Sequence, residues 1–102
     1  MATKEVIVNW LPGTAGPEAD PDEVPVTEKD TKIRWVPGAN VASVDDIGGL
    51  PDDEFTQQGQ IGNGKYQVVD KNSIKKDYPY TIHATQAGGG SGSQDPKIRN
   101  GG

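Results

Sequence analysis

The chain has 102 residues and a formal net charge of −5, and 31% of its residues are hydrophobic. Its length suits one domain, and the acidic balance provides no basic surface for nucleic acid or anionic membranes, so neither is expected as a partner. The absence of cysteine excludes disulfides and thiolate metal sites. No apolar run reaches the length of a membrane span or of a signal-peptide core, so a cytoplasmic location is expected.

Glycine and proline indicate the fold class. The chain contains fourteen glycines and eight prolines, spread as breaks between short segments rich in β-branched and aromatic residues. This distribution argues against long helices and favours short strands joined by turns. We therefore predict an all-β fold, a small two-sheet β-sandwich of about eight strands with an immunoglobulin-like or cupredoxin-like topology.

The first half of the chain is predicted to hold four strands. Residues 5–10 form the first strand, which ends at Pro12-Gly13, and the polar segment 14–23 is expected to be an exposed loop. Strands at 24–27 and 32–36 surround a turn at 28–30, and Ile33 and Trp35 alternate with charged residues, so one strand face is buried. A further strand is expected at 40–44.

The second half is predicted to begin with a hairpin, residues 55–61 and 65–71, around the Asn63-Gly64 step. Residues 78–84 alternate in the manner of a half-buried strand, and their natural partner is the C-terminal segment 97–99. Residues 88–94 are expected to be a flexible Gly/Ser loop, and residues 96–102 a C-terminal strand peptide. The whole chain, 1–102, is interpreted as one sandwich domain.

Common metal and binding sites find little support. A blue-copper site needs two histidines and a cysteine, whereas this chain has only His83, which is expected to lie on the surface. No calcium-binding or phosphate-binding loop is present, so no metal or cofactor is expected. Exposed Trp10 or Trp35 would suit a carbohydrate- or peptide-binding module, but alternating tryptophans are more typical of a core.

The Asp95-Pro96 bond is the feature with the most specific chemistry. An aspartate side chain can attack its own main-chain carbonyl to form a five-membered anhydride, and the proline nitrogen is a comparatively basic leaving group. Proline has no N–H, so the competing succinimide cannot form. The same dipeptide occurs at Asp20-Pro21 within the expected loop, where it indicates only turn chemistry.

Residues 78–82, the glycine-rich connection and the ending 95–100 together resemble the DP-EP family of small bacterial proteins. The resemblance implies a β-sandwich that cleaves its own chain after Asp95 and keeps the C-terminal peptide bound as a strand. It also implies that the new aspartyl end can be joined to a lysine, for which the chain offers Lys76, which we favour, and Lys75.

Two carboxylates, Asp77 and Asp70, are candidates to activate water or to give a proton to the Pro96 nitrogen. The hypothesis is thus a self-cleaving, single-turnover Asp-Pro endopeptidase with itself as substrate. The alternative is a non-enzymatic structural or binding sandwich that assembles with itself, with the C-terminal strand exchanged between subunits over the glycine loop.

Overall fold

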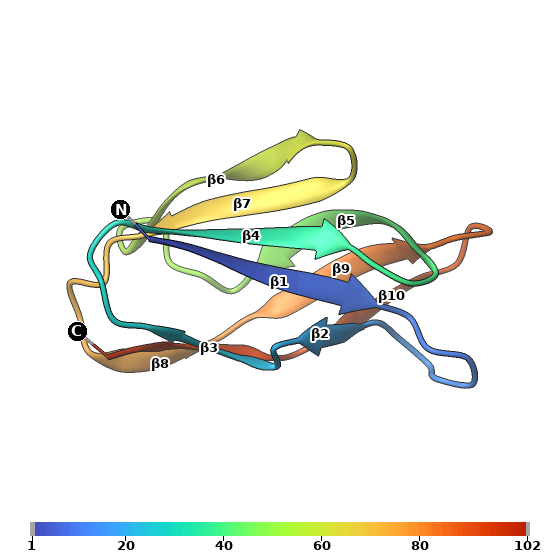
Figure 1. Cartoon of the computed structure of the whole chain (residues 1–102), viewed down its shortest axis with the longest axis horizontal. Coiled ribbons are helices and arrows are strands. Elements are labelled where there is room, and N and C mark those ends of the chain that lie inside the picture. Colours follow the sequence, from blue (N-terminus) through green and yellow to red (C-terminus); the bar gives the residue numbers. More distant parts are fainter. Residues whose placement is uncertain (1, 102) are drawn as a thin grey trace.

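A computed structural model describes residues 2–101, which form eleven β-strands and no helix (Figure 1). The strands are β1 (Thr3–Asn9), β2 (Glu18–Asp20), β3 (Glu23–Val26), β4 (Thr31–Pro37), β5 (Val41–Gly48), β6 (Phe55–Gly62), β7 (Lys65–Asp70), β8 (Lys76–Pro79), β9 (Thr81–Gln86), β10 (Ser91–Gln94) and β11 (Lys97–Asn100). The predicted all-β class is confirmed. Since the described residues contain no helix, none of them could cross a membrane in helical form.

The strands belong to three sheets, where the sequence had predicted two. A five-stranded sheet has the order β2-β1-β4-β7-β6, and two three-stranded sheets have the orders β10-β9-β5 and β3-β11-β8. Two pairs, β1 with β4 and β11 with β3, are parallel, and the others are antiparallel. All three sheets contribute buried apolar residues to one core cluster.

Alternation along the strands explains which side chains reach this core. Ile33 and Trp35 on β4 are fully buried between half-buried charged residues, as predicted. Tyr80 is buried in the core, where its hydroxyl accepts a hydrogen bond of 3.0 Å from the Trp35 indole Nε1. Trp10 is also buried, so neither tryptophan offers an exposed platform for a sugar or peptide.

The predicted hairpin of residues 55–71 is present as β6 and β7. Its turn contains Asn63 and Gly64, both with positive φ, 53° and 74°. Such angles are required by the tight turn that matches the twist of paired strands, and Asn followed by Gly adopts them at little cost. The Asn63-Gly64 step therefore accounts for the turn of this hairpin.

Two expected loops are partly strands. Residues 18–20 of the expected 14–23 loop form β2, which pairs with β1, and β3 begins at Glu23. In the expected 88–94 loop, residues 91–94 form β10 and pair with β9. Gly92 packs directly on Trp10, where an added Cβ would lie 2.7 Å from the indole ring. This glycine therefore provides close packing, and the prediction of a flexible loop through residue 94 was wrong.

Residues 76–100 form one long β-hairpin that passes through both three-stranded sheets. The register Gln94↔Ile82 in one sheet continues as Lys97↔Pro79 in the other without a shift. The expected strand 78–84 is divided at Tyr80 into β8, in one of these sheets, and β9, in the other. In Figure 1 the hairpin tip projects at the end of the molecule opposite the two termini. The Asp95-Pro96 bond lies where the returning arm passes from one sheet to the other.

Candidate functional site

The Asp95-Pro96 bond connects β10 to β11 at a corner between two sheets. By the continuous register, Asp95 lies opposite Thr81 and Pro96 lies opposite Tyr80. Asp95 is exposed, and its Oδ1 accepts a hydrogen bond of 2.8 Å from the Thr81 hydroxyl. Pro96 is buried, and its carbonyl oxygen accepts a hydrogen bond of 3.0 Å from the Tyr80 N–H. The two sides of the bond are thus held by the opposite arm of the hairpin.

The environments of the two sides differ in a way that matters for chemistry. The Thr81 hydroxyl restricts rotation of the Asp95 carboxyl group but leaves Oδ2 available, since no other hydrogen bond to this side chain is present among the described residues. On the other side of the bond, Pro96 is held by its burial and by the hydrogen bond from the Tyr80 N–H. Thr81 therefore orients the Asp95 carboxyl group, a contact that the sequence had not indicated.

The chain beyond the bond forms the middle strand of a sheet. β11 pairs in parallel with β3 and antiparallel with β8, and the side chain of Ile98 is fully buried in the core. A middle strand satisfies its backbone hydrogen bonds on both sides. The predicted pairing of segment 97–99 with the strand that contains Tyr78 is confirmed.

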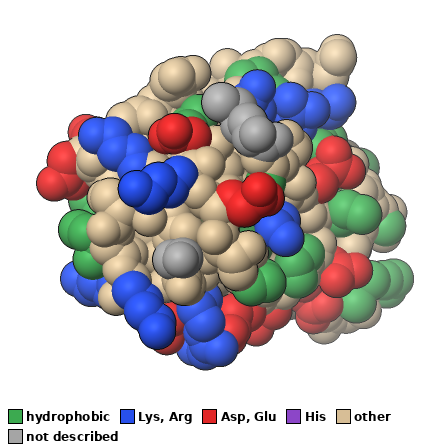
Figure 2. Space-filling model, turned by 60° about the vertical axis from the view of Figure 1, so that its left-hand side comes forward, with side chains coloured by type: hydrophobic (Ala, Val, Ile, Leu, Met, Phe, Trp, Pro, Cys, Tyr) green, Lys and Arg blue, Asp and Glu red, His purple; other side chains and the backbone are tan. Residues whose placement is uncertain are grey.

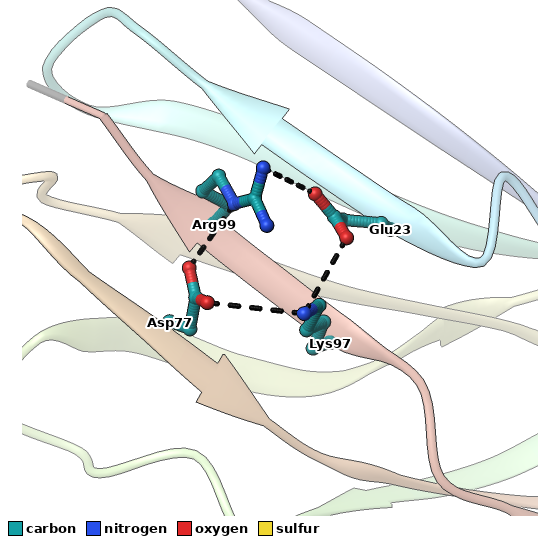
Figure 3. Close-up of polar contacts among 4 residues, drawn as sticks. All are labelled: Glu23, Asp77, Lys97 and Arg99. Atoms are coloured by element: carbon teal, nitrogen blue, oxygen red, sulfur yellow. Dashed lines mark hydrogen bonds and ion pairs between the residues drawn. The ribbon is translucent and has the colours of Figure 1, made fainter.

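The outer face of β11 carries an ion-pair quartet of Glu23, Asp77, Lys97 and Arg99 (Figure 3). Arg99 contacts Glu23 at 2.9 Å and Asp77 at 3.2 Å, while Lys97 contacts the same two carboxylates at 3.5 and 3.8 Å. All four side chains are substantially exposed, so each pair contributes only about 0 to 1 kcal/mol. The main effect of the quartet is that the position between β3 and β8 favours a strand with basic residues on its outer face.

The inner face of β11 ends in a buried polar cluster. Asn100, 1% exposed, donates from its amide nitrogen to Glu54 Oε2 at 3.1 Å and to Asp70 Oδ1 at 3.0 Å. Asp70 also accepts from the Asn72 N–H at 2.8 Å, and Glu54 accepts from Ser73 and from the Ile74 N–H. Asn100 therefore joins two buried carboxylates that come from distant parts of the chain.

The pKa values of these two carboxyl groups are shifted in opposite directions. Burial raises the pKa of Asp70 above its usual range; hydrogen bonds from the Asn72 N–H and Asn100 oppose this shift, and the charge of Glu54 adds to it. Burial alone would also raise the pKa of Glu54, but hydrogen bonds from Ser73, Ile74 and Asn100 outweigh it, so that pKa is lowered. Of the two carboxyl groups, Glu54 therefore ionises more readily than Asp70.

The candidate residues from the sequence divide between the two ends of β11. Asp95 and Pro96 precede the strand, Asp77 lies beside it in the quartet, and Asp70 lies in the cluster at its far end. Lys76 is the register partner of Asn100, five residues along from Asp95, or about 16 Å of strand. Its Nζ lies 5.4 Å from the centre of the Tyr78 ring, and exposed Lys75 precedes it. The structure brings neither lysine to Asp95.

Sequence reasoning missed Thr81, Glu54 and Asn100. Strand alternation could have indicated Asn100, since it follows Ile98 by two residues and therefore shares its inner face. Thr81 would have required the hairpin register. Glu54 carried no local signal, because its partners are 19 to 46 residues away.

Charged side chains also lie elsewhere among the described residues. Acidic and basic side chains are interspersed on the face that Figure 2 shows. His83 is exposed on β9, as predicted. Within residues 2–101 no group of three or more His, Cys, Asp or Glu side chains is placed to hold a metal ion.

Comparison of the chain with protein-family models gave no match, and comparison with curated proteins gave none at the significance required.

Proposed function

We propose that this protein is a self-processing β-sandwich that cleaves its own Asp95-Pro96 bond and retains the segment after the bond, with β11, in its place. One observation carries the proposal. The segment after the bond is the middle strand of a sheet, held on both sides, whereas the bond itself follows an exposed carboxyl group at a sheet corner. A cut at this position would separate the two pieces covalently while leaving almost every contact of the strand intact.

The chemistry is intramolecular. Oδ2 of Asp95 attacks the main-chain carbonyl carbon of the same residue, the C–N bond to Pro96 breaks, and the proton of the neutral carboxyl group passes to the proline nitrogen. The product is a five-membered cyclic anhydride, which one water molecule opens to the free α-carboxyl and side-chain carboxyl groups. Thr81 contributes by limiting the orientations of the attacking group, and such positioning is a major part of intramolecular rate enhancement.

The architecture proposed for this activity is cupredoxin-like. The long hairpin joins the two three-stranded sheets into one continuous layer, which would face the five-stranded sheet across the common core. The molecule measures 19 Å along its shortest axis, which suits two layers packed about 10 Å apart. Parallel pairing of β1 with β4 and of β3 with β11 departs from the antiparallel sheets of an immunoglobulin fold.

The lysine crosslink is not part of this proposal. The separation of Lys76 from Asp95 along β11 exceeds the reach of a lysine side chain, and Asp77 and Asp70 are engaged in the quartet and the buried cluster. The proposed reaction is therefore hydrolysis, with Asp95 and Pro96 as the reacting residues.

Intact mass spectrometry under denaturing conditions tests the proposal. Purified chain is incubated at neutral and mildly acidic pH, and fragments ending at Asp95 are quantified over time. Asp95→Ala removes the attacking carboxyl group and should abolish cleavage after residue 95, while the matched variant Asp20→Ala should leave that cleavage unchanged. Thr81→Val should slow its appearance about fivefold, the equivalent of one hydrogen bond of about 1 kcal/mol.

Two results would reject the proposal. A full-length mass that persists under all conditions would leave the structural sandwich as the better account. Equal cleavage at Asp20-Pro21 would show that the bond at Asp95 is only acid-labile.

A further inference from the structure

The sheet β3-β11-β8 exists only because β11 lies in its middle. β3 and β8 do not pair with each other, and each has β11 as its only partner among the strands of this sheet. Removing β11 would expose two strand edges, the cavity left by Ile98, and the carboxylates of Glu54 and Asp70. We call the space between β3 and β8 the β11 slot. Without a strand in this slot the sheet would not form, and the strand that fills it is residues 97–100 of a chain.

The slot recognises its occupant by an alternating pattern. Outward-facing Lys97 and Arg99 meet Glu23 and Asp77, one acid on each neighbouring strand. Inward-facing Ile98 is fully buried.

The two ends of the slot add further contacts. Inward-facing Asn100 reaches the two buried carboxylates. At one end the Lys97 N–H donates to the Asp22 carbonyl at 3.3 Å, and at the other the Gly101 N–H donates to the Val26 carbonyl at 2.8 Å. These contacts define a specific strand and not an arbitrary extended peptide.

We propose that the β11 slot binds the C-terminal strand of a second copy of this chain, so that copies exchange β11. Every contact described above joins residues 97–101 to the walls of the slot, so each can form whether the strand comes from the same chain or from another. The two states differ only in the connection at the corner and in the entropy of association, so concentration selects between them. Exchange does not need cleavage of Asp95-Pro96, although a cut would remove the connection that favours the chain's own strand.

Disulfide trapping between two single-cysteine variants tests this proposal. The chain has no cysteine of its own. Asp77 lies on β8 at the edge of the slot, and Arg99 lies opposite it on β11, with Arg99 Nε 3.2 Å from Asp77 Oδ1. Chains carrying Asp77→Cys are mixed with chains carrying Arg99→Cys in a thiol redox buffer. In this mixture, exchange of β11 holds the two cysteines side by side, whereas unexchanged chains can form a mixed disulfide only by random collision.

Two controls are needed to interpret the yield of mixed disulfide. The double variant Asp77→Cys/Arg99→Cys should close an intrachain disulfide, which shows that the pair has suitable geometry. Asp77→Cys mixed with Lys29→Cys, an exposed turn position, measures random collision. We expect at least about tenfold more mixed disulfide from the slot pair than from this control, since stable bridges need β-carbons about 3.5 to 4.5 Å apart.

The mass of the trapped species separates exchange from cleavage. Two full chains joined by the disulfide show exchange without a cut, and a chain joined to a peptide of residues 96–102 shows exchange after a cut. Either product supports the proposal. A slot pair that gives no more mixed disulfide than the Lys29 control, while the double variant closes its bridge, overturns the proposal whether or not Asp95-Pro96 is cleaved.

Discussion

Replacing Asn100 with aspartate changes one nitrogen to an oxygen within the buried cluster. The Asn100 amide now donates to Glu54 at 3.1 Å and to Asp70 at 3.0 Å. An ionised aspartate has no donor, so the variant loses both hydrogen bonds and places a third carboxyl group beside two others. Asn100→Asp therefore removes favourable contacts and adds repulsion with almost no change in volume.

The magnitude follows from these contacts. A hydrogen bond to a charged group contributes about 1.5 to 3 kcal/mol, and disrupting a buried charge network typically costs about 3 to 5 kcal/mol. We expect Asn100→Asp to lower the free energy of unfolding by about 3 to 5 kcal/mol at pH 7, a large fraction of the stability of a small domain. At acidic pH the new group is protonated and can donate again, so the loss should become smaller.

Urea unfolding followed by the fluorescence of the buried tryptophans measures this effect at pH 7 and pH 4. The matched control is Asn63→Asp, the same chemical change in the exposed turn between β6 and β7, where the expected change is below about 0.5 kcal/mol. A loss below about 1 kcal/mol for Asn100→Asp at pH 7 would refute the role assigned to this residue. So would a loss that stays the same at the lower pH.

Three further predictions concern β11 and the core. Ile98→Ala should lower the free energy of unfolding by about 2 to 5 kcal/mol, measured by the same urea assay, whereas exposed Ile61→Ala should change it little. Glu54→Gln should destabilise the protein at neutral pH. Because the folded-state pKa of Glu54 is lowered, its stabilising effect is present above the unfolded pKa and is lost as pH falls through the folded pKa, so the two proteins should converge in acid. The pKa of Tyr80 is raised to about 12, mainly by burial; the hydrogen bond with Trp35 opposes this shift and the charge of Asp22 adds to it. Ultraviolet titration of the wild-type protein, compared with Tyr80→Phe, should show this group ionising near that value.

Local sequence predicted the parts of the fold that local physics controls. The alternation around Ile33 and Trp35 and the Asn63-Gly64 turn each depend on neighbours within a few residues, and each was predicted correctly. β2 and β10 were missed because their three and four residues have low strand propensity. They are strands because β1 and β9 provide edges with which they pair, a tertiary effect that overrides propensity.

The candidate site shows the same division. Asp95-Pro96 was visible because its chemistry lies within one dipeptide, and the partner of segment 97–99 was visible from alternation and length. The cluster of Glu54, Asp70 and Asn100 is assembled from three distant strands or turns, so no spacing in the sequence encodes it. Lys76 was favoured because it is near the Tyr78 strand in sequence, but antiparallel pairing places it at the opposite end of β11 from Asp95.

The position of the bond relative to β11 determines what a cut would mean for the molecule. While the chain is intact, β11 competes for its slot at the effective concentration of a short tether, of the order of millimolar. After a cut, the segment from Pro96 onward must hold its place by contacts alone, against an association entropy of about 4 kcal/mol or more. Burial of Ile98 offsets roughly 2 to 3 kcal/mol of this, so it is insufficient by itself. Retention of the peptide therefore depends on the backbone ladders on both sides and on the hydrogen bonds of Asn100, and the same contacts decide whether a strand from another copy can replace it.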